Sequence, residues 1–183
     1  MSIDFNSLPI CLQPYQVQIL ETQKESIEMT LLPSEHLNLW QSKVGGEPYL
    51  PIGQHYPQTL DGENLQLLAQ INFAELPQND LYPQSGILQF FINPNDDLYG
   101  LNFDDQQIQD GFRVIFYDAV TEDQTGLVQD FPAFSDDGYS PVSGQSAIQF
   151  TKSESYIDLN NFDFSERVTD PFAKDDEEDF CDE

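Results

Sequence analysis

The sequence contains three apolar runs that decide the fold: LQLLAQINF at residues 65–73, GILQFFI at residues 86–92 and FRVIFY at residues 112–117. Pro and Gly residues bound the first two runs, and all three are short. Their length, together with their aromatic and β-branched content, favours strands over helices. We therefore expect the three runs to form core strands of an antiparallel sheet.

Weaker patterns predict the elements around these strands. Residues 24–31 alternate polar and apolar side chains, which predicts a half-buried strand that ends at Pro33. Residues 145–151 predict one more strand. Residues 9–22 predict a short helix, because Pro14 suits a first turn and apolar side chains cluster on one side. Since no βαβ rhythm is visible, the sequence predicts an α+β fold, a mainly antiparallel β-sheet with one or two packed helices.

The 183-residue chain is strongly acidic, with 33 Asp and Glu against 6 Lys and Arg and a formal net charge of −27. Hydrophobic residues make up 39% of the chain and aromatic residues 13%, which is enough to form a core. Six basic residues cannot form a stripe along a phosphate backbone, so direct nucleic-acid binding is excluded. Binding to anionic membrane surfaces is disfavoured for the same reason.

Two cysteines, Cys11 and Cys181, stand near opposite ends of the chain and make no disulfide framework. Neither has a Cys or His at the spacing of metal ligands. The first residues lack the basic and apolar regions of a signal peptide, and no apolar run approaches the ~18 residues of a spanning helix. We therefore expect a cytoplasmic protein with no membrane contact.

The end of the chain is a block of like charge. Residues 170–183 hold eight acidic residues and one lysine in fourteen positions. Such charges repel one another, which predicts a solvated, disordered tail with no partner. We therefore expect one domain over residues 1–169 and an acidic disordered tail over residues 170–183.

No local motif nominates a catalytic residue. A nucleophile needs a base and an orienting group brought together in space, and the chain has two histidines, His36 and His55. It has no G-x-S-x-G elbow, although its many serines and carboxylates leave a three-dimensional grouping open. We expect both histidines at surface or turn positions, Cys11 as a small buried hydrophobe, and no cofactor.

Residues 93–104 space their oxygen side chains in the manner of a calcium-binding loop. The weak candidate metal ligands, at positions 1, 3, 5 and 12 of that loop, are Asn93, Asn95, Asp97 and Asp104. However, Leu98 stands where such a loop needs a glycine, position 12 is Asp instead of Glu, and the flanking residues predict strands. The favoured alternative is a polar hairpin connection.

The segment SKVGG at residues 42–46 has a lysine and two glycines but not the residue order of a phosphate loop. The glycines are expected to allow positive φ in a tight turn. A rare cation beside a glycine turn can also hold an anion. The candidate ligand- or anion-binding residues are therefore Lys43, Gly45, Gly46, Tyr49 and Arg113. The alternative, which we favour, is a turn packed by Trp40 and Tyr49.

The same turn lies in a longer stretch, WQSKVGGEPYLP at residues 40–51. This stretch resembles the S-K-x-G-G-x-P-Y-L-P motif of the YwqG-like proteins (DUF1963), a bacterial family of unknown function. LLAQINF at residues 67–73 is similar to the next segment of that family, and three further segments up to residue 114 continue the match in order. The resemblance implies an α+β, sheet-rich fold, and it implies no established reaction, cofactor or catalytic set.

Members of that family are usually longer and carry a second half with G-G-x-P and L-x-Q-I-D-like segments toward the C-terminus. Nothing after Val168 resembles that half. The comparison with longer members therefore implies that this chain is either a natural short member of the family or a truncated product. In either case we expect exposure of a sheet edge or an apolar face that the second half normally covers.

Two functions stay open on these residues. The first is a non-catalytic interaction protein of the immunity or inhibitor type, because a strongly negative surface steers a basic protein toward it and competes for a nucleic-acid cleft. The second is a small-molecule- or metal-binding enzyme with a site around residues 42–46. The lack of a catalytic motif favours the first, with a basic protein as partner, and the residues indicate no oligomeric state.

Overall fold

A computed structural model of the chain describes residues 10–135, 138–158 and 161–168. The expected acidic tail at residues 170–183 lies outside these residues. The chain divides into two compact units: Met29–Phe150 form the larger one, and the segments before and after it form the smaller one. No helix among the described residues has both the length and the apolar composition needed to cross a membrane.

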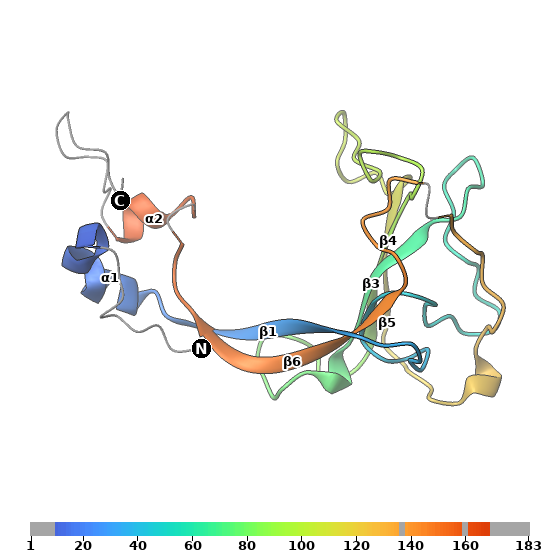
Figure 1. Ribbon diagram of the computed structural model, residues 1–183, viewed down its shortest axis with the longest axis horizontal. Helices are drawn as coiled ribbons and strands as arrows, with labels where there is room; N and C mark the ends of the chain where they lie inside the picture. Colours follow the sequence, from blue (N-terminus) through green and yellow to red (C-terminus); the bar gives the residue numbers. More distant parts are fainter. Residues whose placement is uncertain (1–9, 136–137, 159–160, 169–183) are drawn as a thin grey trace. The chain divides into compact units, whose positions relative to one another are not determined.

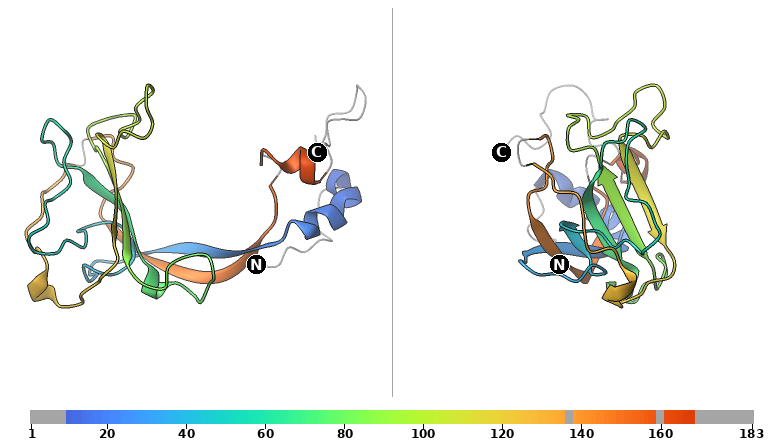
Figure 2. Two further views of the ribbon diagram at one scale, coloured as in Figure 1. Left: turned by 180° about the vertical axis from the view of Figure 1, so that it is seen from behind. Right: turned by 90° about the vertical axis from the view of Figure 1, so that its right-hand side faces the viewer.

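Six strands form one sheet in the order β1-β6-β2-β3-β4-β5, and Figure 1 shows β1 beside β6. Their bounds are Lys24–Pro33 (β1), Lys43–Gly45 (β2), Gln66–Asn72 (β3), Ile87–Ile92 (β4), Phe112–Tyr117 (β5) and Gln145–Ser155 (β6). Each pair of neighbours from β6 across to β5 is antiparallel, and Figure 2 shows β3, β4 and β5 side by side. The expected α+β fold with a mainly antiparallel sheet is therefore confirmed, and each of the three apolar runs forms a strand.

The smaller unit holds the helices that pack together. The 3₁₀ helix η2 (Ile10–Tyr15) continues directly into α1 (Gln16–Glu21), and α2 (Phe164–Arg167) follows late in the chain. Their buried apolar side chains form one cluster of Leu12, Ile19, Phe164 and Val168. The helix expected at residues 9–22 is confirmed over its described part. Two 3₁₀ turns, η3 (Phe73–Glu75) and η4 (Gln124–Gly126), belong to the larger unit.

Burial differs from the expectation at both edges of the sheet. β1 is present but mostly exposed, with Met29 at 57% and Leu31 at 52%, so the predicted half-burial is wrong. β5 is an edge strand in which no residue is fully buried and Phe116 is 48% exposed, so the expected core position of residues 112–117 is wrong. An alternating pattern shows which face a side chain takes, but it does not show whether another layer covers that face.

β2 is a strand that the sequence did not reveal, because it has only three residues within a glycine-rich stretch. It pairs Lys43 with Gln70 of β3, and Gln70 in turn pairs with Gln89 of β4. Directly opposite residues share a face of the sheet. One polar row therefore crosses three neighbouring strands, and its members Lys43, Gln70 and Gln89 are 1%, 0% and 1% exposed.

Apolar side chains border this polar row along β4. Ile87 and Phe91 stand two residues on either side of Gln89, and so they share its face. Each belongs to a buried apolar cluster, one with Leu39, Tyr49 and Leu127 and the other with Leu65 and Leu67. The buried face of the larger unit is therefore apolar at both ends and polar in the middle.

Candidate functional site

The side-chain amide of Gln70 binds the backbone on both sides of the glycine turn. Its Oε1 accepts hydrogen bonds from the Tyr49 N–H at 2.8 Å and from Gln89 Nε2 at 2.7 Å. Its Nε2 donates to the carbonyl oxygens of Leu39 at 2.7 Å and Gln41 at 2.9 Å. This one buried side chain uses four hydrogen-bonding positions, three of them to backbone groups around the turn.

Ser42 and Asn72 make further hydrogen bonds to the backbone and side chains around the glycine turn. The Asn72 N–H donates to Ser42 Oγ at 2.8 Å, and Asn72 Nδ2 donates to the Trp40 carbonyl oxygen at 3.0 Å. The Ser42 N–H donates to Glu75 Oε2 at 2.9 Å. Buried polar groups are stable in a fold when they are paired in this way. We name the stretch that they hold, residues 38–49, the tied segment.

Lys43 stands at the start of β2 and is 1% exposed. Its Nζ donates to the carbonyl oxygens of Asn38 and Glu47, each at 2.9 Å. Burial lowers the pKa of Lys43 from 10.5 to about 8, and the carboxylates of Glu47 and Glu75 oppose that shift. The amine therefore joins two distant points of the tied segment while it still carries a proton at neutral pH.

The tied segment holds four of the five candidate ligand-binding residues: Lys43, Gly45, Gly46 and Tyr49. The two glycines have φ of 69° and 72°, which confirms the expected positive φ. A Cβ on Gly45 would meet the carbonyl oxygen of Gly144. Tyr49 is 1% exposed, and its hydroxyl accepts from the Thr121 N–H at 3.0 Å. Trp40 packs against the cluster that contains Tyr49, as the alternative of a packed turn requires.

Arg113, the fifth candidate, does not join this group. It lies on β5, and two strands, β3 and β4, stand between it and Lys43 on β2. Since neighbouring strands lie about 4.8 Å apart, that arrangement separates the backbones by about 14 Å. Arg113 Nη2 donates to the Gln58 carbonyl oxygen at 3.1 Å. A pocket of about 480 Å³ borders Lys43, but Glu35 and Glu47 also line it, which makes it a poor environment for an anion.

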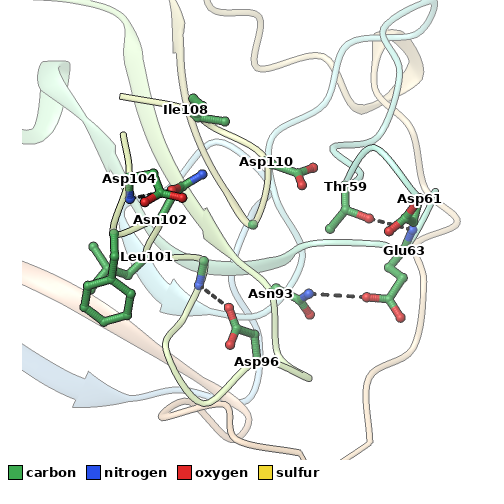
Figure 3. Close-up of a pocket in the computed structure, with 13 residues that line it drawn as sticks. Thr59, Asp61, Glu63, Asn93, Asp96, Leu101, Asn102, Asp104, Ile108 and Asp110 are labelled. Atoms are coloured by element: carbon green, nitrogen blue, oxygen red, sulfur yellow. Dashed lines mark hydrogen bonds between the residues drawn. The ribbon is translucent and has the colours of Figure 1, made fainter. Parts of the chain in front are cut away.

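A second pocket, which we name the acidic pocket, gathers carboxylates from two loops (Figure 3). It has a volume of about 420 Å³ and is lined by residues of 59–63 and of 93–111, the latter being the connection between β4 and β5. Its acidic side chains are Asp61, Glu63, Asp96, Asp104 and Asp110. No Lys or Arg is found among the described residues that line it. The pocket therefore presents a concentrated negative field.

Two of these carboxylates fix the backbone of the loops. Asp96 Oδ2 accepts from the Gly100 N–H at 2.8 Å, within the longer loop. Asp110 Oδ1 accepts from the Leu60 N–H at 2.7 Å and so joins the longer loop to the shorter one. Carboxylates with such bonds to backbone N–H groups are structural elements of the pocket wall.

The other three carboxylates belong to exposed residues. Glu63 Oε2 accepts from Asn93 Nδ2 at 3.3 Å. Within the described part of the chain, no hydrogen bond engages the carboxylates of Asp61 and Asp104, which Figure 3 draws at the pocket. These side chains keep their acceptor positions available to a partner.

The candidate metal ligands are divided by the fold. Asn93 and Asp104 line the acidic pocket, whereas Asn95 and Asp97 do not. Over the described ranges, no group of three or more His, Cys, Asp or Glu side chains could hold a metal ion. Asn93 Oδ1 accepts from the Asn95 N–H at 2.9 Å and so makes a local turn. Residues 93–104 lie in the connection between two paired antiparallel strands, as the hairpin alternative predicts.

The remaining sequence candidates are the histidines and the cysteines, and His36 lines the pocket that borders Lys43. His36 and His55 are both exposed loop residues, as expected. The expectation for Cys11 concerns a side chain that lies outside the described part of the chain, and Cys181 also lies outside it.

Sequence reasoning missed two groups of residues. Gln70 and Gln89 lie within runs that the apolar pattern assigns to the core, and the one available signal is an amide side chain in the middle of each run. The meeting of residues 59–63 with residues 93–111 has no local signal, because tertiary structure alone brings two polar loops together.

The sheet and the tied segment define a class of protein in which buried amides hold a glycine turn against a mainly antiparallel sheet. A family model described as "Domain of unknown function (DUF1963)" matches residues 42–183, from Ser42 in the tied segment onward. Because this match covers most of the chain, the chain belongs to the DUF1963 family, and the expected membership of DUF1963 is confirmed. No curated protein matches the chain.

Proposed function

We propose that the protein is a non-catalytic acidic interaction protein of the immunity or inhibitor type, which binds a basic protein in the cytoplasm. The observation that carries this proposal is the acidic pocket, where five carboxylates meet and no basic side chain among the described lining residues offsets them. The formal net charge of −27 strengthens the local field.

Such a pocket favours a positively charged partner in two ways. Its field steers a basic protein toward it and raises the association rate constant. On contact, the exposed carboxylates of Asp61 and Asp104 accept charge-assisted hydrogen bonds from Lys or Arg side chains. A partner that uses a basic cleft to bind nucleic acid is then blocked, because the acidic protein occupies that cleft.

The alternative function, an enzyme with a ligand at residues 42–46, needs different residues. Its central cation, Lys43, already donates to two carbonyl oxygens of the tied segment. Tyr49 is buried and uses its hydroxyl to hold residue 121. These contacts support a scaffold role for the turn and leave the acidic pocket as the better candidate for binding.

A binding screen tests the proposal. The immobilised full chain is exposed to basic nucleases and to the products of neighbouring genes at about 0.01 M and about 0.15 M salt, between which the Debye length falls from about 30 Å to about 8 Å. We expect a basic protein to bind with an association rate constant that falls by about tenfold or more over this range.

Lys43→Met provides the comparison with the enzyme alternative. The methionine keeps the unbranched shape of the side chain and removes its charge, so we expect binding of the basic protein to persist. The proposal fails if no basic protein binds, and the alternative gains support if an anion binds at residues 42–46 and is lost in Lys43→Met.

A further inference from the structure

A third pocket of the larger unit has mainly aromatic and small walls, and we name it the aromatic pocket. Its volume is about 320 Å³. It is lined by residues 46–48 of the tied segment, by Tyr56 and Gln66, and by residues 131–135 and 142–144. Its composition differs from that of the acidic pocket, and so it calls for a different kind of contact.

The aromatic walls are Tyr56, Phe131 and Phe134. Tyr56 and Phe131 meet edge to face with ring centroids 6.5 Å apart, and Tyr56 also meets Phe91 at 6.1 Å. These two contacts fix the orientation of the Tyr56 ring. Burial raises the pKa of Tyr56, so its ring remains a neutral phenol at physiological pH. A neutral aromatic ring presents a negative face that attracts cations.

Gln66 gives this pocket an acceptor that the chain itself does not use. Its Nε2 makes a long bond of 3.5 Å to the Val142 carbonyl oxygen. Its Oε1 is buried, and no described residue donates a hydrogen bond to it. Buried acceptors without a donor are rare in native proteins and costly to keep. Oε1 has no exposed surface, so a ligand supplies the donor after the Gln66 side chain, held by its one long bond, turns toward the pocket.

The charges of the lining residues also favour a positively charged ligand. Glu47 is the one ionisable carboxylate among the described residues of the pocket wall, and no Lys, Arg or His accompanies it. A carboxylate, an unpaired acceptor and aromatic faces together attract a positively charged donor. They repel an anion, and an apolar ligand would leave the Gln66 acceptor unpaired.

The shape of the cation decides between arginine and lysine. A guanidinium group is planar and carries five N–H donors in its plane, so it can stack on a ring and donate to acceptors at the same time. An ammonium group is compact and strongly hydrated, and it cannot stack. The combination of Tyr56 with Gln66 therefore fits a guanidinium better than an ammonium.

We propose that the aromatic pocket receives the guanidinium group of an arginine side chain of the basic partner protein. This inference rests on the proposed function, because it names the side chain by which that partner docks. The guanidinium lies against Tyr56, donates to Glu47 and, once the Gln66 side chain has turned, donates to Gln66 Oε1. The volume of the pocket, about 320 Å³, accommodates one such side chain.

Small probes test the pocket directly. The ¹⁵N-labelled full chain is titrated with N-acetyl-arginine amide, and the amide resonances of Gln66, Ser143 and Gly144 report on binding. N-acetyl-citrulline amide is the matched probe, because it has nearly the same shape without the charge. We expect the arginine probe to bind about tenfold more tightly than the citrulline probe, and more tightly than N-acetyl-lysine amide. Equal affinities for the arginine and citrulline probes overturn the proposal.

Gln66→Leu separates recognition from stability. The substitution removes an unpaired acceptor and keeps much of the side-chain volume, so we expect the midpoint of unfolding to stay the same or to rise. The affinity for the arginine probe should fall about tenfold, because the acceptor for the guanidinium is lost. Gln149→Leu, at an exposed position of β6, is the matched control and should leave the affinity unchanged. An unchanged affinity in Gln66→Leu contradicts the proposal.

The pair Tyr56→Phe and Tyr56→Leu provides a second readout. We expect Tyr56→Phe to retain the arginine probe, because it keeps the ring, and Tyr56→Leu to lose most of the affinity. Retention of the probe by both variants contradicts the stacked arrangement.

The outcomes also separate this inference from the proposed function. If a basic protein binds with a steep salt dependence but the arginine probe does not bind, the arginine pocket is wrong and the proposed function stands. If the arginine probe binds at Gln66 but no basic protein binds the chain, the proposed function fails and the pocket is a guanidinium site with another source of ligand.

Discussion

The tied segment and the acidic pocket belong to the same unit, but they use their polar groups in opposite ways. At the tied segment, the buried side chains of Lys43 within it and of Gln70 on β3 make six hydrogen bonds to other groups of the chain. In the acidic pocket, Asp61 and Asp104 are exposed, and no hydrogen bond inside the described ranges engages their carboxylates. The side chains of Lys43 and Gln70 are paired within the chain, whereas the acidic pocket offers acceptors to a partner.

Burial accounts for this difference. A polar group inside the fold loses its water and must find a partner in the chain, whereas an exposed carboxylate keeps its water at no cost. The residues of the turn that resemble a family motif are therefore residues that build the fold. The residues that we propose for binding have no motif, because their role depends on charge and position more than on an exact local geometry.

Gln70→Leu should have the largest effect on stability. It leaves the N–H of Tyr49 and the carbonyl oxygens of residues 39 and 41 without a buried partner. Gln89 Nε2 loses its bond to residue 70 and keeps its bond to the Tyr49 carbonyl oxygen. We expect the free energy of unfolding to fall by about 3–5 kcal/mol, measured by urea denaturation. Gln78→Leu, at an exposed position, is the control. A loss below about 1 kcal/mol would show that the tied segment does not depend on this amide.

Gly100→Ala tests how tightly the wall of the acidic pocket is built. Gly100 has φ of 89°, and a Cβ there would meet the backbone of Gly111. Gly53→Ala is a matched control, since Gly53 has φ of 92° and nothing lies within 4 Å of a Cβ. We expect Gly53→Ala to cost about 1 kcal/mol from strain alone and Gly100→Ala to cost about 2–3 kcal/mol. Equal unfolding midpoints would mean that the two loops adjust freely.

Lys43 should give the stability of the protein a specific dependence on pH. Burial lowers the pKa of Lys43 in the folded state to about 8, against the ordinary value of 10.5. Between these values the unfolded chain binds the proton better, so the free energy of unfolding rises with pH. We expect wild type to gain about 1 kcal/mol relative to Lys43→Met between pH 8 and pH 9.

The comparison must stay below about pH 9.5, near the ordinary range of tyrosine titration. Burial raises the pKa values of Tyr56 and Tyr117, so their contribution to stability is present below pH 10 and is lost above it. A constant difference between wild type and Lys43→Met from pH 7 to pH 9.5 would contradict the lowered pKa of Lys43.

Asp104→Asn should have the smallest effect on stability. Its carboxylate is exposed and, within the described part of the chain, accepts no hydrogen bond. We expect the free energy of unfolding to change by no more than about 0.5 kcal/mol. A larger loss would place Asp104 among the structural carboxylates, together with Asp96 and Asp110.

The sequence predicts what depends on local pattern and misses what depends on tertiary neighbours. The strands at residues 66–72 and 87–92 follow from dense apolar runs, and the positive φ of Gly45 and Gly46 follows from the turn. The edge position of β5 does not follow from the sequence, because the residues of a strand do not specify how many neighbouring strands pair with it.

The candidate site shows the same limit. Lys43 and Tyr49 lie close in sequence and in space, but grouping Arg113 with them required knowledge of the strand order. The sequence does not predict the acidic pocket, for a related reason. Carboxylates are so frequent in this chain that no pair of them stands out until two loops are placed together.

The most direct test compares two triple variants that change the net charge equally. The first neutralises the acidic pocket with Asp61→Asn, Glu63→Gln and Asp104→Asn. The second neutralises three exposed carboxylates that do not line the pocket, with Asp118→Asn, Glu122→Gln and Asp130→Asn. The association rate constant of each variant with the basic partner is measured by stopped flow at low salt. We expect a loss of about tenfold or more in the first variant and of about twofold in the second. Equal losses would show that net charge alone draws the partner, and would contradict a binding role for the acidic pocket.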